Sequence, residues 1–143
     1  MAALWTCFFS ASIYPLFGQT EQVRINEFMA LNGSTLMDGD GDYSDWIELY
    51  NAGDQAVSLL GWSLTDDPEY PQEWIFPEVT LDAGEYLVVF ASGKDRKIPG
   101  TELHTSFKLS GDGEYLSLMD AEEEVVTEFS PLFPSMLHGI CVA

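Results

Sequence analysis

The sequence predicts an all-β fold, a sandwich or a barrel, and three observations support that prediction. No segment keeps the 3.6-residue apolar period of an amphipathic helix over three turns. Short apolar segments instead recur about every eight to twelve residues, with Gly, Asp, Asn and Pro between them. Nine Phe, six Tyr and four Trp supply side chains that suit a pleated, half-buried surface. With 143 residues, 46% of them apolar, the chain is long enough for one domain with a real core.

The first half of the chain supplies five candidate strands. Alternation is clearest in 46–51, where Ile47 and Leu49 face one side of the strand and Glu48 faces the other. Gly61 separates two short apolar segments and marks a bend or bulge between them. The expected strands are 23–30, 46–51, 57–60, 62–65 and 73–76.

The second half supplies four more. The continuous apolar run at 85–91 predicts a strand that is buried on both faces. Turn residues at 110–113 and 120–124 separate the later segments, and the expected strands are 85–91, 104–109, 114–119 and 125–129. We therefore expect about seven to nine strands. The side chains predicted to lie inside are Ile47, Leu49, Leu64, Phe76, Leu87, Val89 and Leu116.

The two ends of the chain differ from this pattern. Residues 1–18 are apolar and carry no charged side chain, which predicts a signal peptide and a secreted or cell-surface protein. We expect the β domain to occupy 19–129 and an unpatterned tail to occupy 130–143, ending without a cap or turn as a truncated chain would. Once the leader and its Cys7 are removed, Cys141 stands alone, so no intrachain disulfide is expected. No membrane span is expected after leader removal.

Charge narrows the classes of partner. The chain has 24 acidic and five basic residues, and its net charge is -19. Such a chain repels phosphate backbones and anionic lipid surfaces, so nucleic acid is excluded as a partner. Divalent cations and basic partners remain compatible with this charge.

Five carboxylates are concentrated between residues 38 and 48, and they pose the main chemical question. Asp at alternate positions can turn several oxygens inward on a tight loop, which is the ligand chemistry that calcium prefers. A helix-loop-helix calcium site is excluded, because Tyr43 stands at the sixth position, where Gly is needed, and Leu49 stands at the twelfth, where Glu is needed. A calcium site in a β-sandwich loop and a solvated turn both remain open. The candidate metal ligands are Asp38, Asp40, Asp42, Asp45 and Glu48.

We find no catalytic set in the sequence. No nucleophile motif is present, and His104 lies in a predicted strand, where a lone histidine is usually structural. The segment 92–96 places Lys94 and Arg96 near a glycine but lacks the spacing of a phosphate loop, so it is interpreted as a polar loop that pairs with carboxylates. A sugar-binding face built from Trp46, Trp62, Trp74 and Tyr86 is an alternative to burial of these rings in the core.

A set of eight sequence blocks resembles the bacterial branch of the lamin-tail domain family. The blocks are Ile25–Ala30, Asp45–Asn51, Leu60–Asp67, Trp74–Pro77, Leu81–Gly84, Tyr86–Arg96, Leu103–Ser110 and Gly113–Asp120. The resemblance implies an immunoglobulin-like β-sandwich without catalysis of its own. It also implies a place within longer secreted or surface proteins.

The sequence therefore predicts a secreted or surface β-sandwich that is not an enzyme and serves binding or attachment, as an accessory to a larger protein. Its ligand is an unidentified protein or carbohydrate, and its oligomeric state is undetermined. Two alternatives remain: a calcium-dependent hydrolase that uses the acidic loop, and a carbohydrate-binding module.

Overall fold

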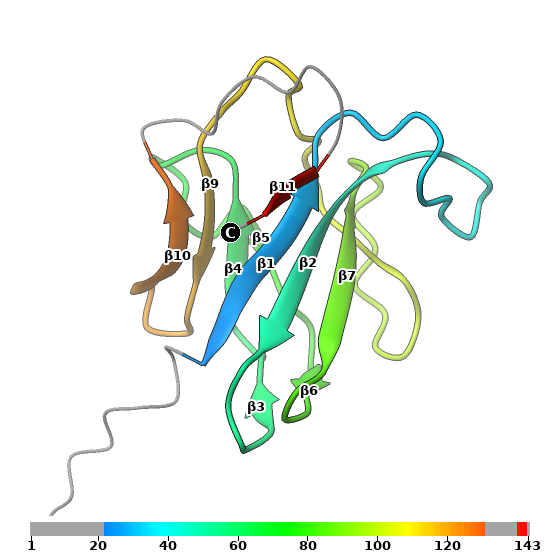
Figure 1. The fold of residues 1–143 in the computed structure, drawn as a ribbon. Coiled ribbons are helices and arrows are strands. Elements are labelled where there is room, and N and C mark those ends of the chain that lie inside the picture. Colours follow the sequence, from blue (N-terminus) through cyan, green and yellow to red (C-terminus); the bar gives the residue numbers. More distant parts are fainter. Residues whose placement is uncertain (1–21, 131–139, 143) are drawn as a thin grey trace, which may run out of the picture.

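Two β-sheets packed face to face form the body of the protein (Figure 1). The computed structural model describes residues 22–130 and 140–142. The predicted signal peptide at 1–18 lies outside these residues. Within the described ranges all regular structure is strand, and no helix there is long and apolar enough to span a membrane.

The first sheet has five strands in the order β11-β1-β2-β7-β8. They are β1 (Val23–Met29), β2 (Asp45–Asn51), β7 (Tyr86–Ala91), β8 (Leu103–His104) and β11 (Ile140–Val142). β1, β2 and β7 pair antiparallel, whereas β8 runs parallel to β7. β11 pairs with β1 antiparallel, so the tail that the sequence left unpatterned contributes a strand.

The second sheet has four strands in the order β10-β9-β4-β5. They are β4 (Ser63–Thr65), β5 (Trp74–Ile75), β9 (Leu116–Met119) and β10 (Val125–Phe129). A separate pair, β3 (Val57–Ser58) with β6 (Thr80–Leu81), closes one end of the sandwich. The described residues thus form eleven strands rather than seven to nine, because sequence patterning did not count the two-residue strand β6 and the strand β11 in the tail.

The core between the sheets consists of the inward-facing side chains of both. Ile47, Leu49, Leu64, Leu116 and Val89 are fully buried, as their alternation predicts. Phe76 is also buried, and Leu87 is partly buried and packs against the same cluster. Predicted core positions and observed core positions therefore agree closely.

A small apolar cluster lies on the opposite face of the first sheet. Met29, Trp46 and Phe90 are aligned across β1, β2 and β7, and Leu36 from the β1–β2 connection packs on them. This loop cover explains why β7 is buried on both faces only toward its end. Tyr86, at its beginning, is 57% exposed, which corrects the expectation that the whole strand is buried.

Candidate functional site

The acidic loop between β1 and β2 is built around the carboxylate of Asp38. Its Oδ1 accepts hydrogen bonds from the backbone N–H groups of Asp40 and Asp42, both at 3.0 Å, and its Oδ2 accepts one from Ser44 Oγ at 2.9 Å. The backbone N–H of Asp38 donates to the carbonyl of Asp42, and Gly41 closes the turn at φ +88, a conformation that favours glycine. One buried carboxylate thus fixes the course of the whole loop.

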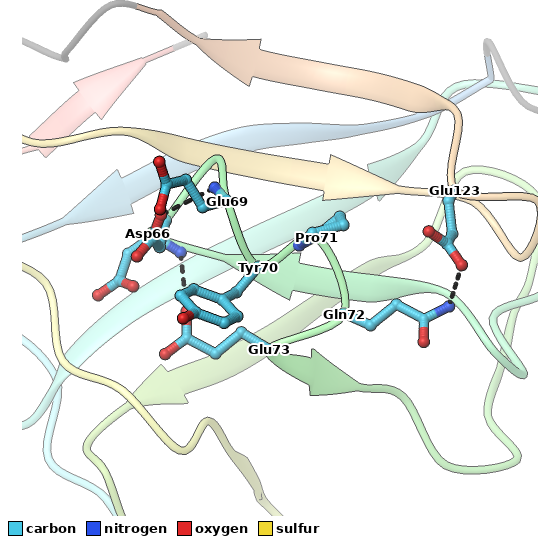
Figure 2. A pocket seen from close by; sticks show the side chains of 8 residues that line it. Asp66, Glu69, Tyr70, Pro71, Gln72, Glu73 and Glu123 are labelled. Carbon is cyan, nitrogen blue, oxygen red and sulfur yellow. Dashed lines mark hydrogen bonds between the residues drawn. The ribbon is translucent and has the colours of Figure 1, made fainter.

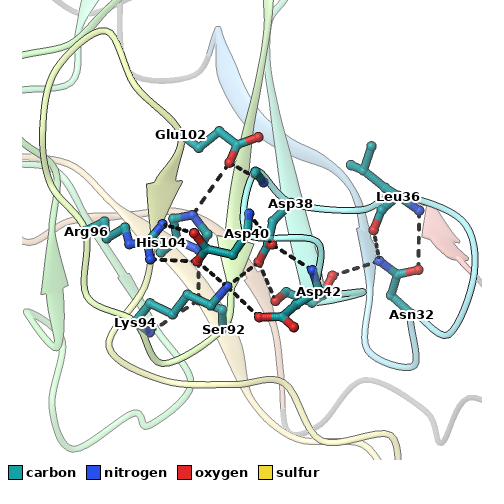
Figure 3. A network of polar contacts seen from close by, with 12 residues as sticks. Asn32, Leu36, Asp38, Asp40, Asp42, Ser92, Lys94, Arg96, Glu102 and His104 are labelled. Carbon is teal, nitrogen blue, oxygen red and sulfur yellow. Dashed lines mark hydrogen bonds and ion pairs between the residues drawn. The ribbon is translucent and has the colours of Figure 1, made fainter.

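Two cations from the connection between β7 and β8 lie over this loop (Figure 3). Lys94 Nζ lies 2.6 Å from Asp38 Oδ2, 2.8 Å from Asp40 Oδ2 and 2.9 Å from Asp42 Oδ2. Arg96 contacts both oxygens of Asp40, at 3.1 and 2.6 Å, in the two-pronged geometry that guanidinium groups favour. A single ammonium group therefore bridges three carboxylates that repel one another.

These contacts shift the protonation of the acids. Burial works to raise the pKa of Asp38, but the hydrogen bonds from Lys94, the loop backbone and Ser44 outweigh it and hold that pKa far below its usual range. The hydrogen bond from Arg96, followed by that from Lys94, lowers the pKa of Asp40 to about 2. Desolvation opposes charge on Lys94, yet its three carboxylate partners raise its pKa. Asp38, Asp40 and Lys94 are thus ionised at neutral pH.

The structure brings together three of the five predicted metal ligands. One oxygen from each of Asp38, Asp40 and Asp42 lies within 4.8 Å of the others. Asp45 is outside this cluster, where its Oδ1 accepts the backbone N–H of Asn32 at 2.9 Å. Glu48 points elsewhere on β2 and accepts a hydrogen bond from the side chain of Asn26 at 2.9 Å. The candidate cation site is therefore Asp38, Asp40 and Asp42.

Three carboxylates are the hard oxygen donors that calcium takes, so the donor type fits. Lys94 Nζ lies within hydrogen-bonding distance of all three and supplies one positive charge to them. A divalent ion could use these oxygens only by displacing that ammonium group. Sequence reasoning placed Lys94 and Arg96 in a carboxylate-pairing loop but did not identify their partners, because these lie about fifty residues earlier in the chain.

His104, on β8, contacts the β7–β8 connection that carries Lys94 and Arg96. It is fully buried, its ring stacks on Phe90 at 5.3 Å, and its Nδ1 lies 2.9 Å from Ser92 Oγ. Its Nε2 lies 3.9 Å from the carboxylate of Glu102, which accepts the backbone N–H of Gly39. Desolvation, followed by the charges of Arg96 and Lys94, lowers the pKa of His104. A neutral, buried histidine therefore lies where the β7–β8 connection meets the acidic loop between β1 and β2.

The four aromatic residues considered for sugar binding do not share one face. Trp46, Trp62 and Trp74 are buried, and only Tyr86 is exposed. Tyr86 stacks on Tyr50 with ring centroids 4.4 Å apart, and Arg24 lies over the Tyr50 ring at 5.2 Å. The ring faces therefore pack against one another or in the core, and the four residues do not form a shared sugar-binding face.

Two packed sheets of mostly antiparallel strands, with a polar network joining loops beyond their ends, define an immunoglobulin-like domain. A family comparison identifies the particular type: residues 18–131 match the Lamin Tail Domain. The chain belongs to this family, as the eight blocks indicated. No curated protein matches it.

Proposed function

We propose that this lamin-tail domain is a secreted or surface-exposed, non-catalytic module for binding or attachment, accessory to a larger protein. The observation that carries the proposal is the ionic bridge from Lys94 and Arg96 to the acidic loop. It joins the β1–β2 and β7–β8 connections into one ordered surface. A surface ordered before binding loses less entropy when a partner docks. Loops on a rigid sandwich are also the usual place for recognition.

The binding test uses exposed side chains in or next to the acidic loop that take no part in the hydrogen bonds and ion pairs described above. Met37 and Tyr43 are 49% and 42% exposed, and Val125 on β10 is a control of matched exposure at 50%. The full chain and the variants Met37→Ser, Tyr43→Ser and Val125→Ser are applied to glycan and peptide arrays. We expect the full chain to bind at least one ligand on the arrays. Binding to that ligand should fall in Met37→Ser and Tyr43→Ser but not in Val125→Ser. No retained ligand, or equal losses in all three, would contradict the proposal.

Secretion has its own test. Expression of the full chain followed by mass spectrometry of the exported protein should show a mature N-terminus beyond residue 18, because the uncharged apolar segment is a suitable leader. Exported protein that retains Met1 would contradict it. Assays with ester, glycoside and phosphodiester substrates, with and without calcium, address the alternative of a hydrolase. Turnover that disappears in Asp40→Asn would favour that alternative.

Calcium binding is a second candidate function, and the convergence of Asp38, Asp40 and Asp42 favours it. The ion would replace the Lys94 ammonium as the counter-charge of the loop. Calcium titration by calorimetry of the wild type and Asp42→Asn tests this proposal, because Asp42 is 66% exposed and its loss removes one anionic ligand. If both proteins give only the heat of dilution, calcium does not bind, and the Lys94 ammonium is the counter-ion of the loop.

A further inference from the structure

A second site lies on the outer face of the four-stranded sheet, away from the acidic loop. The connection between β4 and β5, residues 66–73, folds back over β4 and is held by a hydrogen bond from Ser63 Oγ to the carbonyl of Pro71 at 2.8 Å. The connection and Glu123 of the β9–β10 turn line an open hollow of about 510 Å³. Figure 2 shows the side chains gathered around it.

The hollow combines negative charge with an exposed aromatic ring. Tyr70 is 65% exposed and lies beside the carboxylate of Glu73 in Figure 2. The carboxylates that line it are Asp66, Asp67, Glu69, Glu73 and Glu123. A carboxylate attracts a cation by charge, and an aromatic face attracts it through the ring quadrupole.

No lysine or arginine side chain of the protein lines this hollow. The five basic residues all lie in the described part of the chain, and none lines the hollow. Lys94 and Arg96 serve the acidic loop, Arg24 lies on Tyr50, Lys97 pairs with Asp95, and Lys108 lies near Asp45. Among the described residues, no lysine or arginine side chain therefore supplies a counter-charge to the hollow.

The floor beneath the connection contains an unsatisfied polar group. Ser117 on β9 is aligned with Thr65 on β4, so both side chains project to this outer face. Thr65 Oγ1 donates to Glu73, whereas the hydroxyl of Ser117 is fully buried and has no hydrogen-bond partner among the described residues. Buried polar groups are normally paired, so this hydroxyl is an exception, although Ser117 does not itself line the hollow.

We propose that this hollow binds the positively charged side chain of a basic peptide segment, a lysine or arginine, between Tyr70 and the carboxylates of Asp66 and Glu73. The side chain enters from the outer face, its charge meets the carboxylates, and its alkyl stem lies along Tyr70 and Pro71. The site is separate from the loop surface proposed above, so either proposal can fail without the other.

Protonation gives the site a characteristic signature. Burial, followed by the neighbouring carboxylate of Glu73 and the charge of Glu114, raises the pKa of Asp66 to about 7. A cation bound beside Asp66 favours its ionised form and so expels this proton. Binding should therefore release protons near neutral pH and should be tighter at pH 8 than at pH 6.

The test uses short capped lysine and arginine peptides, with acetyl-lysine peptides as the uncharged control. Binding to the full chain is followed by calorimetry and by NMR shifts. We expect saturable binding of the basic peptides, with shifts at 66–73 and Glu123, and no binding of the acetylated peptide. Tyr70→Ala should weaken binding by about threefold, as loss of an exposed cation–π contact of roughly 0.5–1 kcal/mol predicts, whereas Tyr70→Phe should retain it.

A chain with net charge -19 attracts any polycation, so a charge-matched control decides specificity. Glu73→Gln and Glu78→Gln remove the same charge, but only Glu73 lines the hollow. Weaker binding in Glu73→Gln alone supports the site. Equal losses in the two variants, shifts confined to the Asp38–Asp42 loop, or similar affinity for the acetylated peptide would overturn it.

Discussion

Lys94 and Asp38 form an ionic contact of 2.6 Å between Nζ and Oδ2, although 56 residues separate them in sequence. The Asp38 side chain is fully buried and the Lys94 side chain is 22% exposed. A buried carboxylate is costly unless it is paired and hydrogen-bonded, and this one has both kinds of partner. The contact therefore holds two loops together at one end of the sandwich.

Lys94→Met should destabilise the protein by roughly 1–3 kcal/mol, because it leaves the buried carboxylate of Asp38 without its charged partner. Urea unfolding at neutral pH measures the change. Lys97→Met is the control, since Lys97 forms an exposed pair with Asp95 at 3.3 Å, and exposed pairs contribute about 0–1 kcal/mol. Equal losses in the two variants would show that Lys94 contributes no more than a surface charge.

The β-sandwich could be predicted because the apolar pattern of each longer strand is contained in a short stretch of sequence. Alternation in 46–51 determines which side chains of β2 face inward, and Ile47 and Leu49 are indeed buried. The family blocks then fixed the fold type, and the match over residues 18–131 confirms it. The strands β6 and β11 were not predicted, because segments of two or three residues carry too little pattern.

The site could be predicted only in part because its information is non-local. The spacing of Asp38, Asp40 and Asp42 correctly indicated convergent carboxylates. Asp45 and Glu48 share the same acidic stretch, but they begin and continue β2, where pairing with β1 and β7 directs their side chains to other partners. Lys94 meets the loop because it follows the end of β7, where Ala91 pairs with Asp45 at the beginning of β2, and no sequence spacing reveals that pairing.

The core should respond to truncation much more strongly than the surface. Leu64→Ala removes a fully buried side chain of β4 and should cost about 2–5 kcal/mol, through lost burial and the cavity left behind. Leu60→Ala makes the same chemical change at a position that is 58% exposed and should cost under about 1 kcal/mol. Thermal or urea unfolding compares them, and similar costs would contradict the described packing of β4.

Asp66 should make the protein less stable as pH rises through neutrality. Its folded pKa is about 7 against an ordinary value of 3.8, so the stability it contributes is fully present below pH 3.8 and is lost as pH rises through about 7. Asp66→Asn mimics the protonated form and should raise stability at pH 8 by on the order of 1 kcal/mol, after allowance for solvent screening. Urea unfolding at pH 5 and pH 8 measures this, with Asp67→Asn as the neighbouring control. An equal gain at both pH values would contradict the assignment.

Asp40 acts in the opposite direction at acidic pH. Its folded pKa is about 2, so its contribution to stability is present above the ordinary value of 3.8 and is lost as pH falls toward 2. Arg96→Met should remove the largest cause of this shift and flatten the fall in stability between pH 4 and pH 2. Unfolding midpoints across that range provide the measurement, and Arg24→Met, which leaves the acidic loop untouched, is the control. An unchanged slope in Arg96→Met would separate the acid sensitivity from this pair.

Calcium and Lys94 should compete for the same three carboxylates. In Lys94→Met the ammonium is gone, so calcium should bind this variant more tightly than the wild type and restore stability lost by the substitution. At an excess of about 100 times the dissociation constant the gain is roughly 2.7 kcal/mol, because the ion binds the native loop and not the unfolded chain. Thermal melts with calcium and with chelator at matched ionic strength measure it in the wild type, Lys94→Met and Lys97→Met. If calcium leaves the midpoint of Lys94→Met unchanged, the loop is a solvated turn whose charges are balanced from within the chain.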